Sequence, residues 1–314
     1  MTSENAEAPA DGGTIGEAGT LPFDTTVAHQ ARMYDFVLGG KDNYAADRAA
    51  VEAGLEAWPD MAFAMRANRA FLGRVVRYLA GEAGIRQFLD IGTGIPTAGN
   101  THQVAQAIAP ESRVVYVDYD PVVLAHARAL LTSHEAGATE YIDADLRDTG
   151  TILERAAQLL DFTKHVAVTL LAIVHVIPDA DDPHAIVAKV MDAVPSGSYL
   201  AISHAGSDLF DEDTRDSFGG VMKQMMRQRF TPRSREEVAR FFTGTDFVEP
   251  GLVSVEEWRP DPDAVDEGKS SIYGAVGRKR ETGRSLPRDS QDLTNSGCHN
   301  RLADGGGRGV AQVD

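Results

Sequence analysis

The stretch Phe88-Leu89-Asp90-Ile91-Gly92-Thr93-Gly94-Ile95-Pro96-Thr97 joins a short apolar run to a turn that contains two glycines. The apolar run has the length and composition of a strand that is covered on both faces of a parallel sheet. Gly92 and Gly94 allow a tight turn and let a ligand approach the backbone closely. Because open parallel sheets bind ligands at the carboxyl ends of their strands, the sequence predicts a ligand site at this loop.

Outward from this stretch, short apolar runs alternate with helical segments. The runs cover residues 87–91, 113–118, 139–142, 166–172 and 199–203. Asp120-Pro121 and Asp182-Pro183 are typical of helix N-termini, and residues 151–154 and 234–237 have the spacing of capping boxes. This alternation predicts an α/β fold with a mostly parallel sheet and right-handed crossovers.

The flanks of this region have different patterns. Before it we expect only helices, at about residues 29–38, 45–57 and 61–80. After it, residues 247–258 and 270–277 read as two strands separated by a loop rich in Pro and Asp. The second flank therefore predicts an antiparallel pair at the end of the sheet.

Both ends of the chain have the composition of disordered segments. Residues 1–24 contain no Lys or Arg and are mostly Gly, Ala, Thr and Glu, and residues 281–314 contain no aromatic residue. Neither segment can bury enough apolar surface to offset the entropy lost on ordering. We therefore expect two disordered tails around one folded domain, residues 25–280.

Charge and composition exclude several classes of protein. The 314 residues include 30 Lys and Arg against 47 Asp and Glu, a formal net charge of −17, which is unsuited to a nucleic-acid backbone. The longest apolar run, residues 166–177, is shorter than the roughly 20 residues of a membrane span. With no signal peptide visible, we expect a cytoplasmic protein. Cys298 is the single cysteine, so an intrachain disulfide is excluded.

Three interpretations of the glycine loop are open. A dinucleotide loop has three glycines and sets a diphosphate on a helix N-terminus, but Thr97 stands here in place of the third glycine. Asp90 would repel a diphosphate and attract a cation. The acid therefore favours S-adenosylmethionine, which carries sulfonium and ammonium groups. The third interpretation is a plain turn whose glycines serve backbone geometry alone.

Two more acids follow the next two strands. Asp118 ends the second strand, where a carboxylate can accept hydrogen bonds from both ribose hydroxyls. Asp145 follows the third strand and can accept from an adenine amino group, although a turn aspartate is the alternative. Three acids at the carboxyl ends of successive strands together predict an S-adenosylmethionine site.

These motifs resemble motifs one to three of class I S-adenosylmethionine-dependent methyltransferases. Residues 31–35, 38–44, 66–69 and 87–94 are similar to one actinobacterial group, the S-adenosyl methyltransferase family once grouped as a domain of unknown function. The resemblance implies a Rossmann-like, doubly wound, seven-stranded sheet with an antiparallel last strand, and it implies no particular acceptor. It also implies that the cofactor is bound by Asp90, Gly92, Thr93, Gly94, Asp118, Asp145 and Leu146.

In related methyltransferases, an N-terminal helix folds over the cofactor. The resemblance therefore implies a helical lid over residues 25–81 and a sheet domain over residues 82–280. Within the lid, Tyr34, Asn43 and Tyr44 could face the cofactor or the acceptor, and we expect Tyr34 to bind the cofactor. The alternative is a helix hairpin without a ligand role.

Two arginines follow on the next helix. Arg66 and Arg69 lie three residues apart and so share one helix face. Either one of them pairs with the carboxylate of the donor, or both belong to a salt-bridged surface.

His175 is the candidate catalytic base. It follows the fourth strand, and its His-x-x-x-Asp spacing resembles the catalytic segment of small-molecule O-methyltransferases, although Val176 and Ile177 replace the Asp-Trp pair found there. A neutral imidazole can take a hydroxyl proton during methyl transfer. A core histidine is the alternative, and His204 is a weaker candidate base.

The segment before the final strands contains Met222, Met225 and Met226, which suit either an adaptable acceptor pocket or plain core. No residues have metal-ligand spacing, so we expect no metal. We expect an S-adenosylmethionine-dependent methyltransferase that acts on an unidentified small-molecule acceptor, without nucleic-acid or membrane partners. The alternatives are a non-catalytic S-adenosylmethionine-binding protein and a nucleotide-dependent oxidoreductase.

Overall fold

A computed structural model of the chain describes residues 24–97, 99–130, 133–226, 230–262 and 268–281. The expected tails, residues 1–24 and 281–314, lie outside the described residues except for Asp24 and Glu281.

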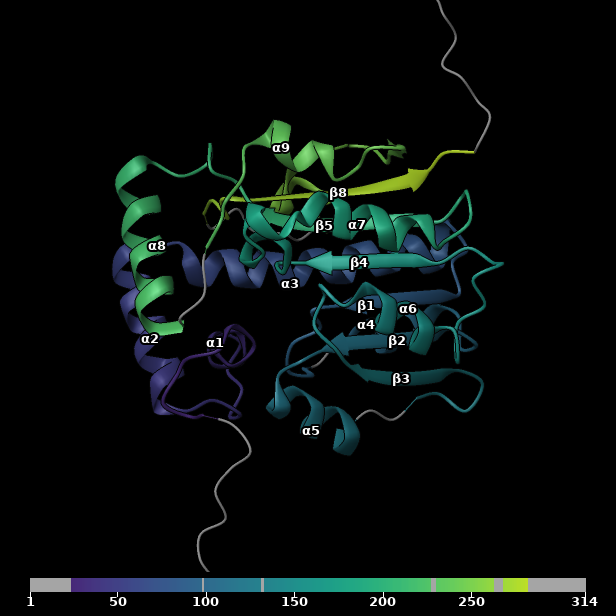
Figure 1. Ribbon diagram of the computed structural model, residues 1–314, viewed down its shortest axis with the longest axis horizontal. Helices are drawn as coiled ribbons and strands as arrows, with labels where there is room; N and C mark the ends of the chain where they lie inside the picture. The colour runs from purple at the N-terminus through teal and green to yellow at the C-terminus, as the bar shows by residue number, and fades with distance from the viewer. Residues whose placement is uncertain (1–23, 98, 131–132, 227–229, 263–267, 282–314) are drawn as a thin grey trace, which may run out of the picture. The chain divides into compact units, whose positions relative to one another are not determined.

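Seven strands pair side by side in one mixed sheet (Figure 1). Their spatial order is β3 (Ala138–Asp143), β2 (Arg113–Asp118), β1 (Gln87–Ile91), β4 (Ala167–Leu171), β5 (Tyr199–Ala205), β8 (Ile272–Lys279) and β6 (Thr245–Phe247). Strands β1 to β5 are parallel, and β8 runs antiparallel to its neighbours β5 and β6. The predicted α/β sheet with seven strands and an antiparallel last strand is confirmed.

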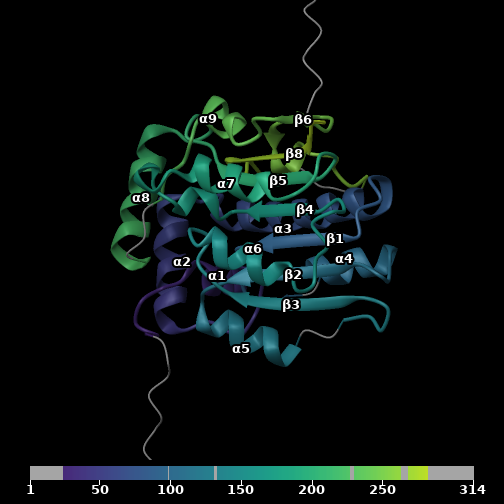
Figure 2. The same cartoon turned by 45° about the vertical axis from the view of Figure 1, so that its right-hand side comes forward.

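Helices cover both faces of the sheet because strand residues alternate between two cores. Phe88 packs with side chains of α3 (Met61–Arg77) and α4 (Thr101–Ile108). Its neighbour Leu89 packs on the other face with α6 (Thr149–Ala156), α7 (Pro183–Asp192) and α9 (Arg235–Arg240). Figure 2 shows the sheet between these two helical layers. Every residue of β1 and β5 is buried, as expected for central strands with two covered faces.

The expected strand over residues 247–258 is wrong as a single element. The chain leaves β6 at Phe247, turns, pairs briefly with β8 as β7 (Val253–Ser254) and ends in a 3₁₀ turn, η4 (Val255–Glu257). Pro250 and Gly251 cause the break. Pro250 has no amide hydrogen for a ladder, and Gly251 takes a φ of +91° while its amide donates to the Val248 carbonyl at 2.9 Å.

Most expected helix starts are confirmed. Asp120 caps α5 (Pro121–Leu130) by accepting from the Val122 amide at 2.7 Å, and Asp182 caps α7 in the same manner. Ser234 and Glu237 form the expected capping box of α9.

The capping box expected over residues 151–154 is wrong. Helix α6 begins two residues earlier, at Thr149, because the Asp148 carboxylate accepts from the Thr151 amide at 3.1 Å. An aspartate at the N-cap position thus takes the place of the Thr151 hydroxyl.

The N-terminal part of the chain is helical, as expected. It forms α1 (Gln30–Val37), α2 (Ala45–Ala57) and α3, which continues into one π-helical turn, η1 (Tyr78–Glu82). Helix α1 packs against α2 and α3, and α2 packs against α8 (Glu212–Met226). Figure 1 shows α1, α2 and α8 beyond the arrowheads of the parallel strands. The division at residue 81 between a lid and a sheet domain stays a prediction.

The segment of residues 38–44 builds the turn between α1 and α2. The Asp35 carboxylate accepts from the Asp42 amide and from the Asn43 side chain, both at 2.8 Å. Gly39 has a φ of +81°, and a Cβ atom on Gly40 would collide with the Asp35 carboxylate. The glycines are therefore required by the turn itself.

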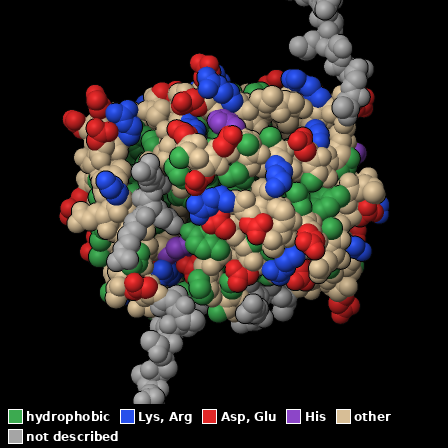
Figure 3. All heavy atoms as spheres, viewed as in Figure 1, with side chains coloured by type: hydrophobic (Ala, Val, Ile, Leu, Met, Phe, Trp, Pro, Cys, Tyr) green, Lys and Arg blue, Asp and Glu red, His purple; other side chains and the backbone are tan. Residues whose placement is uncertain are grey.

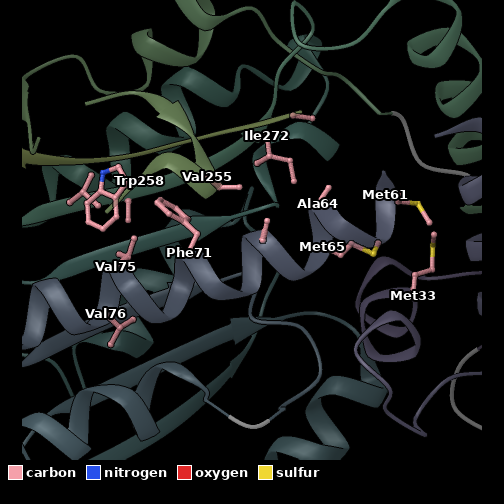
Figure 4. Close-up of a cluster of buried hydrophobic side chains, with 14 of the residues drawn as sticks. Met33, Met61, Ala64, Met65, Phe71, Val75, Val76, Val255, Trp258 and Ile272 are labelled. Carbon is pink, nitrogen blue, oxygen red and sulfur yellow. The ribbon is translucent and has the colours of Figure 1, made fainter. Parts of the chain in front are cut away.

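Helix α3 carries much of the core on one face of the sheet. Phe71 is fully buried and meets the Trp258 ring edge-on at 5.5 Å. Figure 4 shows Phe71, Val75 and Trp258 together along the helix, while Met33, Met61 and Met65 gather at its N-terminal end. The first group joins the segment before the last strand to α3, and the second joins α1, through Met33, to the start of α3.

We expect Phe71→Ala to lower the free energy of unfolding by about 3–5 kcal/mol, because it removes a buried ring and leaves a cavity. Urea unfolding measures this change. Phe247→Ala is the control, since the Phe247 ring is 43% exposed and its removal should cost far less. Equal losses in the two variants would contradict the position of Phe71 in the core.

Candidate functional site

A cavity of about 450 Å³ lies at the carboxyl ends of β1, β2 and β4, beneath α1 and beside α3. Its volume is typical of pockets for small ligands and cofactors. Its polar lining residues are His29, Gln30, Tyr34, Asp35, Asn68, Arg69, Asp90, Thr93, Thr97, Asp118, Tyr119, Asp145 and Arg147. Every residue that the sequence assigned to cofactor binding lines this cavity, including Leu146, whereas His175 does not.

The glycine loop forms one wall of the cavity. Gly92 and Gly94 have φ angles of +79° and +69°, in the left-handed region that favours glycine. A Cβ atom on Gly92 would stand 2.7 Å from the side chain of Ile173, so the first glycine also permits a close approach between two loops. The Gly92 amide donates to the Val117 carbonyl at 2.8 Å, which ties the loop to β2.

Asp90 lies on the floor of the cavity and is 4% exposed. Its two oxygens accept from the Thr101 hydroxyl at 2.6 Å and from the Thr169 hydroxyl at 2.7 Å. Burial raises the pKa of Asp90, and the two hydroxyls oppose that rise. The carboxylate therefore joins β1 to β4 and to the start of α4, and it remains part of the cavity wall.

Of the two arginines expected on one helix face, only Arg69 lines the cavity; Arg66 is exposed. The Arg69 guanidinium donates to the Asn100 side chain at 2.9 Å. Burial lowers the pKa of Arg69, and the nearby Asp90 opposes that shift. The cavity thus contains a positive and a negative side chain close to one another.

Asp118 is 7% exposed at the end of β2, and its carboxylate accepts hydrogen bonds from three backbone amides. Tyr119 and Asp120 donate to Oδ1 at 2.8 and 3.0 Å, and Gly94 donates to Oδ2 at 2.9 Å. Burial raises the pKa of Asp118, while these amides oppose the rise. Since a carboxylate has about four acceptor positions, one position on Oδ2 is left for a ligand.

Asp145 is held by a neighbour that the sequence interpretation missed. The Arg147 guanidinium donates to its two oxygens at 2.8 and 2.6 Å, and the Arg147 amide donates at 2.8 Å. These contacts lower the pKa of Asp145. Arg147 also reaches Asp181 at 3.1 Å, so it links the loop after β3 to the loop after β4. The sequence did carry a signal for the Asp145–Arg147 pair, because the two residues are only two positions apart.

Helix α1 covers the cavity through contacts with two other elements. The Gln30 side chain donates to the Ala172 carbonyl at 2.8 Å, at the end of β4. His29 Nδ1 lies 2.7 Å from the Asp120 carboxylate, at the end of β2. The local sequence carries no signal for these pairings, because their members lie more than ninety residues apart.

Tyr34 is the single member of the expected Tyr34, Asn43 and Tyr44 set that lines the cavity. Its hydroxyl accepts from the Asn68 side chain at 3.3 Å. Burial raises the pKa of Tyr34 to about 12, so the phenol is neutral at pH 7. The other two residues belong to the turn after α1.

His175 is 5% exposed and lies behind Gln30. Its Nε2 is 3.4 Å from the Gln30 amide nitrogen, and the Ala205 amide donates to its Nδ1 at 3.4 Å. Burial, and then the charge of Arg233, lower the pKa of His175 to about 4. His175 lines a second, smaller cavity instead, and its role as a base stays a prediction.

Arg233 is a buried residue that the sequence interpretation missed. Its guanidinium donates to the Ile177 carbonyl at 3.0 Å and to Nε2 of His204 at 2.9 Å, and it pairs with Asp179 at 2.6 Å. It therefore fixes the loop after β4, which contributes Ile177 and Pro178 to the large cavity. His204, held by Arg233, lines neither cavity.

Acidic and basic side chains are interspersed with hydrophobic ones on the face drawn in Figure 3. Among the residues that the structure describes, no helix is long and apolar enough to cross a membrane. The same part of the chain contains no group of three or more His, Cys, Asp or Glu side chains that could hold a metal ion.

Comparisons with known proteins point to one family. A family model described as S-adenosyl methyltransferase matches residues 17–280. A DUF574 family protein from Streptomyces avermitilis has 45% sequence identity and a TM-score of 0.79, over 82% of this chain and 99% of that one. A candidate methyltransferase from Thermobifida fusca has 36% identity and a TM-score of 0.74, over 82% and 96% of the two chains. No curated protein matches the chain.

The lowered pKa of His175 predicts a loss of stability in acid. The unfolded chain takes up a proton at this side chain near its ordinary pKa of 6.5, whereas the folded chain does so only near 4. Its stabilising effect is complete above pH 6.5 and is lost as the pH falls from 6.5 through 4. The free energy of unfolding, measured with urea at pH 7 and at pH 5, should therefore change less between the two pH values in His175→Asn than in the wild type. His165→Asn, at an exposed position, is the control, and an equal effect there would contradict the argument.

Proposed function

The chain belongs to the S-adenosyl methyltransferase family, and on that premise we propose that the large cavity holds S-adenosylmethionine while a small-molecule acceptor binds next to it. The observation that carries this proposal is the gathering of the glycine loop, Asp90, Asp118 and Asp145 around one cavity of about 450 Å³. When bound, the donor supplies a methyl group on a positively charged sulfur. The residues of the chain bind and orient the reactants, which is the main source of catalysis in such a reaction.

We assign the methionine end of the donor to Arg69 and Asp90. This end carries a carboxylate and an ammonium group, and the cavity offers a guanidinium and a carboxylate near one another. Both oxygens of Asp90 already accept from threonine hydroxyls, but each keeps acceptor capacity toward the cavity. A guanidinium and a carboxylate that line one cavity complement a zwitterion better than they complement a diphosphate.

We assign the ribose to Asp118 and the adenine to the loop of Asp145 and Leu146. One acceptor position on Asp118 suits one strong hydrogen bond from a ribose hydroxyl, in place of the bidentate pair expected from the sequence. Arg147 orients Asp145, and both Asp145 oxygens already accept hydrogen bonds from the Arg147 guanidinium. An adenine amino group would donate a further hydrogen bond to one of these oxygens. The apolar side chain of Leu146 lies in the same wall.

We propose that His175 takes the proton from an acceptor hydroxyl. It is one side chain away from the large cavity, because Gln30 lies between them and lines both cavities. A histidine with a pKa near 4 is neutral at pH 7 and so can accept a proton. It is also a weak base, so its contribution belongs at the low end of general-base catalysis.

Calorimetric titration tests the donor assignment. S-adenosylmethionine and S-adenosylhomocysteine should bind, and NAD should not. Arg69→Gln should weaken the binding of S-adenosylmethionine by roughly 10- to 150-fold, the range for a lost hydrogen bond to a charged group. Arg66→Gln, one turn away on the exposed side of the same helix, should leave the affinity unchanged. Binding of NAD alone, or equal losses in the two arginine variants, would refute the assignment.

Transfer of a labelled methyl group into a small-molecule extract tests the role of His175. His175→Asn should lower the turnover of a hydroxyl acceptor by about 10²-fold, because the released proton loses its acceptor. The affinity for S-adenosylhomocysteine should not change, since His175 does not line the donor cavity. Full turnover in this variant would show that no base is needed at this position.

A further inference from the structure

A second cavity, of about 40 Å³, shares Gln30 and Tyr34 with the donor cavity. Its other lining residues are Met33, Trp58, Met61, Ala64, Met65, His175, Ala205, Phe218, Met222, Met226, Phe230 and Ile272. We propose that this cavity is the acceptor pocket and that it takes an uncharged aromatic molecule that carries a hydroxyl group. The inference rests on the proposed function, because this pocket can be an acceptor site only if the adjacent cavity holds the methyl donor.

The position of the pocket follows from α1. Gln30 bonds to the Ala172 carbonyl at the end of β4 and also approaches His175 at 3.4 Å. Tyr34 bonds to Asn68 of α3. These two side chains of one helix form the boundary that the two cavities share, so a molecule in the second cavity lies next to the donor site.

The lining excludes a charged acceptor. No Asp, Glu, Lys or Arg is present among the described residues that line this pocket. Its two titratable members, Tyr34 and His175, are both neutral at pH 7, because burial raises the pKa of Tyr34 to about 12 and lowers that of His175 to about 4. A carboxylate or an ammonium group would lose its hydration here without gaining a partner of opposite charge. An acceptor hydroxyl has Gln30, Tyr34 and His175 as polar neighbours.

The aromatic lining favours a flat ring. Phe218 meets Trp58 at 5.2 Å and Phe230 at 5.0 Å, and Phe230 meets His175 at 5.5 Å, all edge-to-face. This row of rings leads from α2 to the end of β4. A further ring can join it in the offset or edge-on geometry that aromatic groups prefer.

The methionines allow the pocket to enlarge. A cavity that holds benzene measures about 150 Å³, so side chains must move before a ring enters a pocket of this size. Met33, Met61, Met65, Met222 and Met226 are unbranched and flexible, and they are five of the fourteen described residues that line the pocket. Met61 and Phe218 also approach α2 where Gly54 leaves room, since a Cβ atom there would stand 2.8 Å from the Met61 sulfur.

Calorimetry with phenol, benzoate and benzylamine at pH 7 tests whether the pocket takes only uncharged molecules. The full chain is first saturated with S-adenosylhomocysteine. The three probes share one ring and are neutral, anionic and cationic. Phenol should bind, and the two ions should show no heat of binding. Binding of either ion as tightly as phenol, or no binding of phenol, would overturn the inference. Failure of S-adenosylhomocysteine itself to bind would overturn the proposed function and this inference with it.

A pair of methionine variants tests the location. Met222→Ala enlarges the pocket and should bind 1-naphthol about tenfold more tightly than the wild type, because more of the second ring is buried. Met225→Ala, on the same helix, removes a partly buried side chain that does not line the pocket and should have no such effect. Met226→Ala serves if Met222→Ala does not fold. Equal effects of the lining and control variants would place the probe elsewhere and overturn the inference.

Discussion

A buried carboxylate, that of Asp90, holds the carboxyl edge of the sheet together. One of its oxygens accepts a hydrogen bond from the Thr169 hydroxyl of β4, and the other accepts one from the Thr101 hydroxyl of α4. Burial raises the pKa of Asp90, whereas the two hydroxyl donors and the nearby Arg69 favour its charged form. The strand ends, the first helix of the sheet and the floor of the large cavity are thus joined by one side chain.

Local features were predicted well from the sequence because their causes are local. Strand β1 and helix α2 have the predicted bounds, since burial on both faces and helix propensity act within a few residues. Gly92 and Gly94 were assigned to a tight turn, and the φ angles of both residues are positive. The two failures, the strand over residues 247–258 and the cap at Thr151, also have local causes. Pro250 has no amide hydrogen for a ladder, and the Asp148 carboxylate takes the place of the Thr151 hydroxyl at the cap.

The rest of the site could not be predicted, because it depends on partners far apart in the chain. Gln30 and Ala172 are separated by 142 residues, and Arg233 and Asp179 by 54. No spacing rule joins such pairs before the fold is known. The same limit applied to Arg66 and Arg69, which look alike on a helix until α3 is placed against the sheet and one of them faces the cavity. Asp145 was identified, but its tight pairing with Arg147 changes what its carboxylate can offer.

Helix α1 borders two cavities with the same two side chains, Gln30 and Tyr34. A ligand that moves either side chain on binding therefore links the occupancies of the two cavities thermodynamically. Any molecule that shifts Gln30 away from the Ala172 carbonyl changes the wall of both cavities at once. If one ligand alters the affinity of the other by some factor, the second must alter the first by the same factor, because both routes lead to one ternary complex. The order in which the two ligands arrive then affects the rates of assembly and leaves the stability of the assembled complex unchanged.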